Sequence, residues 1–372
     1  MTKKLLLTLS ILLSTIAFSQ NISLSEKAKV SILTCGLGPE SYAMYGHTGI
    51  RIQDSLKGID VVYNYGAFDF STPNFIGKFV KGDLQYFVTN GSFIDFYYNY
   101  QAENREIIEQ EIQMNPAQMN LLFQQLNHSV YSDERFYTYK FIDRNCTTMV
   151  VDKINGILGK EYIKSDTSNQ TYREILYPYM TDFYMKLGIQ LIFGAKVDEP
   201  ATRLFLPYEF KEAISYTKVN GNAIEKSNKR ILEVSKTEVS FNWMNSIYSL
   251  IAILLALVLA NKKWIQISYF VFAGILGLFF SLVGFYSLHE EVLWNYNILL
   301  FNPLLLVFAW YLKKGIKEKI VLLGQIILAM LLLYLAYMTT KIHLEIVWPF
   351  IALHFYWIGK IVLQIKKSNL TR

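Results

Sequence analysis

The 372-residue chain has only 2 cysteines and 5 histidines, the residues that most often bind metal ions or act as nucleophile and base in catalytic sites. Cys35 and Cys146 stand far apart, and together with the histidines they match no zinc-binding spacing, so a zinc site is excluded and no cofactor is predicted. Arginine-rich stretches interleaved with aromatic residues are also lacking, which excludes a nucleic-acid-binding protein. The scarcity directs attention to individual cysteine and histidine residues.

Negative charge is nearly absent from the last third of the chain. Residues 241–372 carry 11 Lys and Arg but 4 Asp and Glu, whereas residues 20–240 carry 23 and 26. The formal net charge of +6 at pH 7 therefore arises in the most apolar part and does not indicate a nucleic-acid partner. The length and this change in composition predict two domains, residues 20–240 and residues 241–372.

The first 19 residues have the pattern of an export signal. Lys3 and Lys4 precede an apolar core over residues 5–18, and Ala17-Phe18-Ser19 fits the small-x-small cleavage rule. That core is too short to cross a bilayer well. We therefore expect a signal peptide over residues 1–19 that is removed, with the following domain outside the cytoplasm.

Long apolar stretches are concentrated after Asn242. Each has about the 20 residues that a bilayer-spanning helix needs, and all are too long and too uniform for the helices of a soluble core. The sequence therefore predicts an all-α domain of five transmembrane helices, over residues 244–260, 265–288, 292–312, 320–340 and 346–363.

Lysine is distributed unevenly among the loops that join these helices. Lys262 and Lys263 follow the first helix, four lysines lie between the third and the fourth, and Lys366 and Lys367 follow the fifth, whereas the other two loops share one lysine. Because lysine-rich loops stay in the cytoplasm, we expect a cytoplasmic C-terminus and a periplasmic domain over residues 20–240. This orientation agrees with the export signal.

Ionisable residues also fall in the loops that are predicted to face outward, among them His289, Glu290 and His343. Such groups near the membrane surface can orient a lipid head group or assist a neighbouring domain, which makes these three candidate substrate-binding residues. The alternative is that they are ordinary interfacial loop residues.

Strands and helices are mixed in the outer domain, which indicates an α+β fold. Apolar or alternating runs bounded by glycine and proline predict strands over residues 28–35, 47–52, 60–65, 84–89 and 137–143. One helix is expected from Pro116 to His128, and another from Cys146 onward. Residues 218–238, rich in lysine and glutamate, are expected to form a surface helix or a linker.

Cys146 is predicted at the first position of a helix, where the positive end of the helix dipole favours the thiolate. Cys35 ends a predicted strand and has no such helix, so Cys146 is the expected nucleophile. His47 begins a predicted strand, and an imidazole near its ordinary pKa can serve as the base at neutral pH. Asn64, on the next strand, is the expected group that orients this imidazole.

Asp69 and Asp60 are the alternatives to Asn64 for this orienting role. Four residues that flank the pair in the sequence either shape a substrate pocket or have structural roles: Tyr45, Arg51, Asp69 and Asn145.

Five short segments stand in a characteristic order: residues 34–42 (TCGLGPESY), 45–48 (YGHT), 63–70 (YNYGAFDF), 73–75 (PNF) and 145–148 (NCTT). Together they resemble the Lnb-type family of bacterial lipoprotein N-acyltransferases. The resemblance implies a periplasmic α+β domain of the circularly permuted papain-like (NlpC/P60-like) kind, followed by a five-helix transmembrane domain. In such domains the histidine precedes the cysteine, as His47 precedes Cys146.

The same resemblance implies a membrane-bound acyltransferase of the bacterial inner membrane. Its partners would be a phospholipid acyl donor, diacylglyceryl-modified lipoproteins and the lipid bilayer. An acyl chain would pass through a thioester on Cys146 to the N-terminal amine of a lipoprotein, with Cys146, His47 and Asn64 as the catalytic residues. Two alternatives remain open. One is a membrane-tethered NlpC/P60-like cell-wall peptidase or amidase, and the other is a non-enzymatic receptor in which Cys35 and Cys146 form a disulfide.

Overall fold

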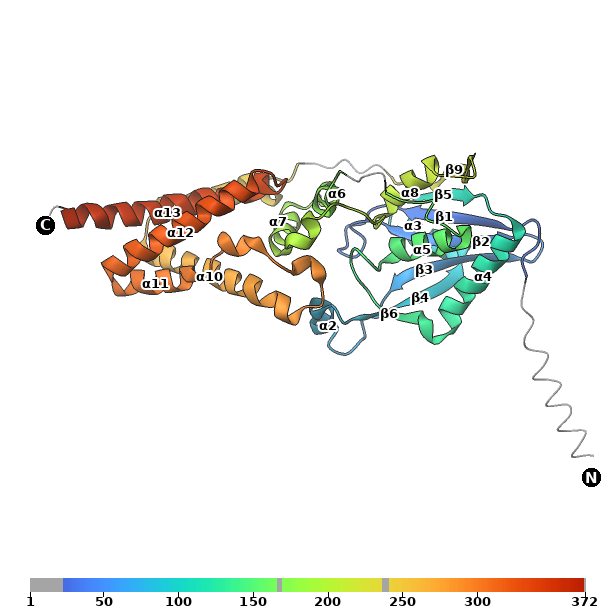
Figure 1. Ribbon diagram of the computed structural model, residues 1–372, viewed down its shortest axis with the longest axis horizontal. Coiled ribbons are helices and arrows are strands. Elements are labelled where there is room, and N and C mark those ends of the chain that lie inside the picture. The colour runs from blue at the N-terminus through green and yellow to red at the C-terminus, as the bar shows by residue number, and fades with distance from the viewer. Residues whose placement is uncertain (1–22, 166–168, 236–240, 371–372) are drawn as a thin grey trace, which may run out of the picture.

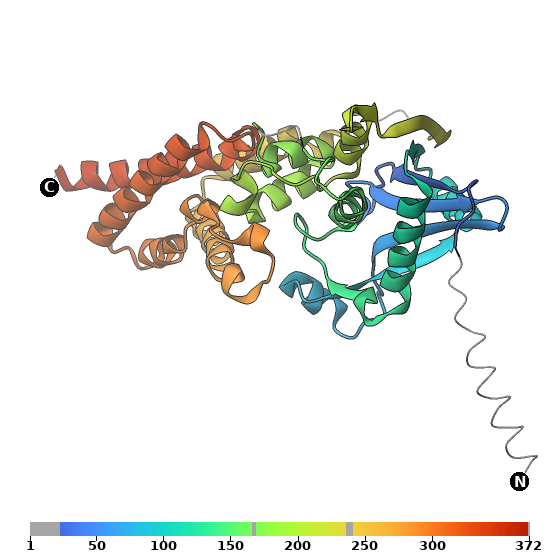
Figure 2. The same cartoon turned by 45° about the vertical axis from the view of Figure 1, so that its right-hand side comes forward.

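The computed structural model describes residues 23–165, 169–235 and 241–370, which form two parts placed end to end (Figure 1). A sheet-rich part precedes residue 236, and a helical part follows residue 240. Seen from a second direction, the helical part again extends away from the sheet (Figure 2). The predicted signal peptide, residues 1–19, lies outside the described residues.

A seven-stranded sheet in the order β6-β4-β3-β2-β1-β5-β9 forms the centre of the first part. All neighbouring strands are antiparallel. The strands are β1 (Lys29–Cys35), β2 (His47–Asp54), β3 (Ile59–Ala67), β4 (Gln85–Ser92), β5 (Ile107–Ile112), β6 (Phe136–Thr138) and β9 (Glu225–Leu232).

Side chains that alternate along the strands give the sheet two covered faces. Ile50 and Tyr63 point into a core that they share with α4 (Pro116–Tyr131) and α5 (Cys146–Leu158). Val62, next to Tyr63 in the chain, faces the opposite way and packs with Phe96 of α3 (Phe93–Ala102). The sheet is therefore a rigid support for the first residue of α5.

The expected strands at residues 28–35, 47–52, 60–65 and 84–89 are confirmed, as are the two expected helices. The predicted strand over residues 137–143 is only three residues long as β6, because a turn closed by pairing of Lys140 with Arg144 leads into α5.

The expectation of a helix or linker over residues 218–238 is wrong for residues 218–235, and residues 236–238 lie outside the described residues. Residues 218–232 form a small hairpin, β7 (Lys218–Val219) and β8 (Asn222–Ala223), and then β9, which pairs with β5 at the border of the sheet. Most residues of β9 are at least partly exposed. A border strand open to water carries charged residues that discourage pairing with another chain, so it lacks the apolar alternation by which strands are recognised.

Short helices complete the first part. They are α2 (Phe75–Lys81), α6 (Tyr172–Leu176), α7 (Phe183–Ile192) and α8 (Pro207–Tyr216), with 3₁₀ turns η1 (Asp133–Arg135), η2 (Tyr177–Tyr179) and η3 (Ala195–Asp198). The helices α6 and α7 lie between the sheet and the helical part (Figures 1 and 2).

The helical part contains α9 (Ile247–Ala260), α10 (Lys263–Tyr286), α11 (Leu304–Lys314), α12 (Lys317–Met338) and α13 (Leu344–Leu370), with 3₁₀ turns η4 (Trp243–Asn245), η5 (Glu290–Val292) and η6 (Tyr296–Leu299). Four segments among the described residues are long and apolar enough to cross a membrane: 263–286, 290–314, 317–338 and 344–368. With 14 residues, α9 is about 21 Å long and shorter than the ~30 Å hydrocarbon core. The prediction of five spans is thus supported for four.

The second of these segments is not one continuous helix, because η5 and η6 precede α11. Asn295 and Asn297 donate their side-chain amides to carbonyl oxygens at the end of α7, at 2.8–3.4 Å. Irregular backbone is tolerated at membrane depth where it is buried in protein. Contact with the first part therefore explains why this stretch is not helical.

A buried ion pair joins the two parts. Arg173 of α6 is 1 % exposed and donates to Asp198 at 3.0 Å and to the side-chain oxygen of Gln190 at 2.7 Å. Tyr296 of the helical part donates its hydroxyl to Asp198 at 2.8 Å, and Lys341 lies 3.4 Å from the same carboxylate. Charged groups from both parts therefore meet at one enclosed point.

Replacement of Arg173 by methionine leaves Asp198 buried without its main partner. Loss of one member of a buried pair costs about 3–5 kcal/mol, so we expect a clear fall in the thermal unfolding temperature of the full-length protein in detergent. Arg203→Met is the matched control, because the Arg203–Asp152 pair is exposed and such pairs contribute at most ~1 kcal/mol. Equal unfolding temperatures for the two variants would contradict the structural role of Arg173.

Candidate functional site

The turn before β2 fixes the start of that strand at His47. Gly46 has a φ of +80°, and a β-carbon added there would lie 2.5 Å from the carbonyl oxygen of Cys35. Only glycine fits a left-handed position so close to another backbone segment. The Cα of His47 then pairs with that of Cys35 across the antiparallel ladder.

Cys146 occupies the first position of α5, and Asn145 is the N-cap of this helix. The side-chain oxygen of Asn145 accepts hydrogen bonds from the backbone N–H groups of Thr147 and Thr148, at 2.8 and 3.0 Å. Its amide nitrogen donates to the carbonyl oxygens of Phe141 and Phe205. Asn145 is buried and fully engaged, so it holds the first turn of α5 in place.

The His47 imidazole and the backbone N–H of Thr48 lie close enough to the Cys146 thiol that both lower its pKa. The second ring nitrogen of His47, Nε2, lies 3.1 Å from the side-chain oxygen of Asn64. Because Nε2 faces Asn64, Nδ1 is the nitrogen left for the thiol. His47 therefore lies next to both Cys146 and Asn64, and the joint catalytic role of the three residues stays a prediction.

Two opposing effects act on the acidity of Cys146. Burial raises the pKa of this thiol, while the neighbouring His47, the Thr48 backbone N–H and the Thr147 hydroxyl lower it, and the net pKa lies below the ordinary cysteine value. Its position at a helix start adds a favourable field for the thiolate. Cys146 is partly exposed, so a reagent can reach it.

Cys35 has a different environment, although it lies opposite His47 in the sheet. It is fully buried, and burial raises its pKa to about 12 despite a hydrogen bond with Tyr100. Both cysteines are free thiols, so the disulfide that the receptor alternative requires is not formed.

Arg51 lies four residues after His47 along β2, about 13 Å away at the strand rise. Its guanidinium forms ion pairs with Asp60 at 2.7 Å and Glu109 at 3.1 Å and lies over the ring of Phe93. These contacts hold the guanidinium at a distance from His47 along the strand, so Arg51 is not brought to the cysteine.

Two further expected residues flank the site without a hydrogen bond to the pair. Asp69 is exposed in the loop after β3 and accepts hydrogen bonds from Ser71. Tyr45 is partly buried, packs its ring against Phe141 and Tyr179, and has a buried hydroxyl without a partner among the described residues. Burial raises the pKa of this hydroxyl.

Two of the three ionisable residues expected at the outer surface, His289 and Glu290, contact the first part of the chain, whereas His343 contacts Tyr296 of the helical part. His289 Nε2 lies 2.8 Å from the carbonyl oxygen of Phe79, and Glu290 lies 3.7 Å from the Lys140 ammonium. His343 is buried, and its Nε2 lies 3.4 Å from the Tyr296 hydroxyl. Burial, together with nearby Arg173 and Lys341, lowers the pKa of His343 to about 2. His343 is therefore neutral.

Several residues near the site were not predicted from the sequence. Gly66, with a φ of +94°, lets β3 approach Cys146 closely. Glu291 accepts a hydrogen bond from the Ile142 backbone, four residues before Cys146. Glu209 is largely buried with an unpartnered carboxyl oxygen, and burial raises its pKa to about 8. Only the glycine has a recognisable signal, since it directly follows the strand residues Tyr63-Asn64-Tyr65.

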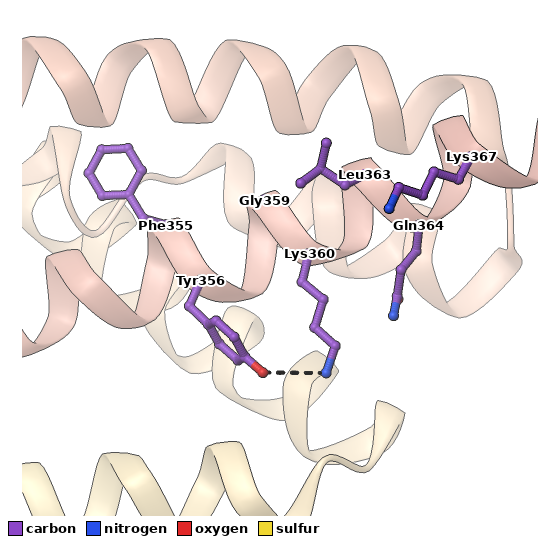
Figure 3. A pocket seen from close by; sticks show the side chains of 7 residues that line it. All are labelled: Phe355, Tyr356, Gly359, Lys360, Leu363, Gln364 and Lys367. Atoms are coloured by element: carbon purple, nitrogen blue, oxygen red, sulfur yellow. Dashed lines mark hydrogen bonds between the residues drawn. The ribbon is translucent and has the colours of Figure 1, made fainter.

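A shallow hollow of about 430 Å³ lies elsewhere, on the surface of α13 (Figure 3). Its lining residues all belong to this helix, and they include Tyr356, Lys360 and Lys367. They lie toward the end of the helical part that is farthest from the sheet (Figure 1). This hollow is therefore separate from the Cys146 site.

The fold and the site define a membrane protein with an outer α+β domain that presents a cysteine and a histidine next to a set of apolar helices. Residues 17–177 match the family model of the Lnb N-terminal periplasmic domain, and residues 238–368 match that of the Lnb transmembrane domain. The chain belongs to the Lnb family and is an inner-membrane protein with a periplasmic N-terminal domain. No curated protein and no solved structure matches the chain.

The lowered pKa of Cys146 predicts its reactivity with iodoacetamide. In the folded protein, the alkylation rate should rise with pH around a midpoint below that of ordinary cysteine, while buried Cys35 stays unmodified. In His47→Ala the effect of the imidazole is lost while burial remains, so the midpoint should rise. Mass spectrometry of the two cysteine-containing peptides measures both rates.

His128→Ala is the matched control for this experiment, because His128 is exposed on the same domain and lies beside Glu134. The alkylation profile of His128→Ala should equal that of the wild-type protein. An unchanged midpoint in His47→Ala would mean that the imidazole does not act on the thiol.

Proposed function

We propose that this protein transfers an acyl chain from a phospholipid, through a thioester on Cys146, to the N-terminal amine of diacylglyceryl-cysteine lipoproteins. The observation that carries the proposal is that His47 lies beside Cys146, whose pKa it lowers, and is held by Asn64 at 3.1 Å. A thiol next to an oriented base is the arrangement that covalent acyl transfer needs. Membership of the Lnb family supports the same reaction class.

In the first step, His47 holds the thiol proton and the Cys146 sulfur attacks the ester carbonyl carbon of the phospholipid. The developing oxyanion is stabilised by N–H groups of the first turn of α5, of which that of Cys146 is not capped by Asn145. The C–O bond then breaks, and the departing oxygen takes the proton from His47. The products are a lysophospholipid and an acyl thioester.

In the second step, the α-amine of a diacylglyceryl-cysteine attacks the thioester carbonyl. His47 accepts the proton of the amine, the C–S bond breaks, and the sulfur leaves as the thiolate that His47 stabilises. An amide forms and the starting state of the pair is restored. Binding of both lipids at one membrane surface supplies the proximity on which such a transfer depends.

The remaining expected residues support this reaction in different ways. Asn145 holds the first turn of α5, and Arg51 stabilises the sheet that carries His47. Tyr45 and Asp69 flank the site, where they line the approach of a substrate. His289 and Glu290 position the outer domain against the membrane helices, and His343 supports Tyr296, which donates to Asp198 of the outer domain. We prefer these roles to direct head-group binding because each residue has a partner in the protein.

Two finer features complete the proposal. The lysines at the ends of the apolar helices favour a cytoplasmic C-terminus, and α9 acts as a fifth membrane helix despite its short length. The order of histidine before cysteine supports a circularly permuted papain-like domain.

A cell-wall peptidase or amidase is the second candidate, since the same pair could attack a peptide bond and water could release the product. The contacts of the Cys146 loop with the membrane helices favour a lipid substrate. Lys140 donates to the carbonyl oxygen of Leu288 at 2.8 Å, and the Ile142 N–H donates to Glu291 at 3.3 Å. A peptidase would need only one anchoring helix.

Full-length protein in phospholipid vesicles, supplied with a synthetic diacylglyceryl-cysteine peptide, tests the proposal. The peptide should gain the mass of one acyl chain. Cys146→Ala should abolish this gain, and His47→Ala should slow it by about 10²–10⁴-fold, the usual contribution of a general base. His128→Ala should leave the rate unchanged.

Unchanged transfer by Cys146→Ala would refute the mechanism. Release of peptide fragments from purified cell wall, without transfer to the lipopeptide, would establish the peptidase alternative instead.

A further inference from the structure

The helix α2 exposes apolar side chains to an unusual degree. Ile76 is 76 % exposed, Phe79 50 % and Val80 45 %, and the preceding loop adds Phe70 at 66 %. None of the seven residues of α2 is buried. A contiguous apolar surface of this kind marks a site that contacts another apolar phase.

Three hydrogen bonds attach the C-terminal end of α2 to the helical part. The carbonyl oxygen of Phe79 faces His289 Nε2 at 2.8 Å, and that of Val80 accepts from the Ser287 hydroxyl at 3.1 Å. The carbonyl oxygen of Lys81 accepts from the Leu288 backbone N–H at 2.6 Å. The position of α2 next to the end of α10 is visible in both overall views (Figures 1 and 2).

The end of α10 near α2 is the end that reaches the outer membrane surface. The helix starts after Lys262, on the lysine-rich side, and its 24 residues extend about 36 Å, enough to cross the hydrocarbon core. Phe285 and Tyr286 in its last turn are exposed. The exposed side chains of α2 therefore lie at the level of the outer leaflet.

A row of aromatic rings leads from α2 toward the thiol. The ring of Phe79 stacks on that of Phe75 with centroids 6.3 Å apart, and Phe75 lies 5.8 Å from Phe68. Phe68 contacts Tyr86 at 5.4 Å, and Tyr86 stacks on Tyr139 at 4.5 Å. We call these five residues the aromatic row.

The far end of the aromatic row adjoins Cys146. A β-carbon added to Gly66 would lie 3.9 Å from Tyr139 and 3.7 Å from the Cβ of Cys146, so both residues border the same point of β3. The row thus joins the outer membrane surface to the nucleophile with apolar contacts. An acyl chain that leaves the bilayer must stay covered by apolar surface, because its exposure to water is unfavourable.

We propose that α2 inserts its exposed side chains into the outer leaflet and that the aromatic row binds the acyl chain of the donor phospholipid as it reaches Cys146. This inference rests on the proposed acyl transfer. Lys78, in the last turn of α2, and Lys81, which pairs with Asp83, would face the phosphate groups of the same leaflet.

Insertion is tested without any catalysis. A nitroxide label is attached at Ile76→Cys in full-length Cys35→Ser/Cys146→Ser protein, in bilayers of phosphatidylethanolamine and phosphatidylglycerol. The label should be relaxed more by dissolved oxygen than by a water-soluble nickel chelate. A label at Leu56→Cys, in the equally exposed turn between β2 and β3, should show the reverse. Nickel accessibility at Ile76 equal to that at Leu56 would overturn the insertion, and would favour a protein partner for this surface.

The binding role is tested by the rate at which Cys146 becomes acylated. Ile76→Asp and Phe79→Asp should each slow acylation by vesicle phospholipid at least tenfold, and Ile76→Asp, which lies outside the aromatic row, should leave acylation by a water-soluble short-chain thioester unchanged. Leu56→Asp is the matched control and should slow neither. Suppose that Cys146 of the wild-type protein is acylated by vesicle phospholipid, and that the Ile76 and Phe79 variants are acylated at the same rate. The insertion and binding roles are then refuted, while the proposed function still stands. If the unmodified protein never acylates Cys146, the proposed function fails first.

Discussion

Burial and an adjacent imidazole act in opposite directions on the Cys146 thiol, and the balance between them decides whether this sulfur is a nucleophile. Burial alone gives the behaviour of Cys35, whose pKa is raised to about 12. At Cys146 the combined effects of His47, Thr48 and Thr147 outweigh burial. The surrounding structure preserves this balance: Gly46 sets where β2 starts, Asn145 sets where α5 starts, and the antiparallel ladder brings Asn64 to the imidazole.

A second constraint holds this chemistry at the membrane. The Arg173–Asp198 pair is enclosed between the two parts of the chain, and residues of both parts satisfy it. Glu291 and the carbonyl oxygen of Leu288 reach the loop that leads into Cys146. The distance between the thiol and the lipid surface is therefore fixed by hydrogen bonds and not by a flexible linker, which suits a reaction between two membrane-bound lipids.

Local signals explain which features could be predicted from the sequence. The start of α5 at Cys146 follows from Asn145, a favoured capping residue. The side-chain contact between His47 and Asn64 follows from the placement of these residues on neighbouring strands, which run antiparallel. Apolar length located four membrane helices, but it could not distinguish the short α9 from a full span.

Features that depend on distant partners were not predictable. Arg173 is one charged residue in a mixed stretch, and its partners come from α7, η3 and the helical part. The apolar side chains among residues 292–303 predict the start of a helix. The backbone of this stretch is instead irregular, because Asn295 and Asn297 bond to α7. The strand β9 is recognisable only from its pairing with β5.

The most direct test of the central claim is the mass of Cys146 after the full-length protein meets a phospholipid with isotope-labelled acyl chains and no acceptor. The account predicts one labelled acyl chain on the peptide that contains Cys146, released by hydroxylamine and absent from His47→Ala on the same time scale. A labelled chain on another residue, or transfer to a later-added lipopeptide without any adduct on Cys146, would contradict it.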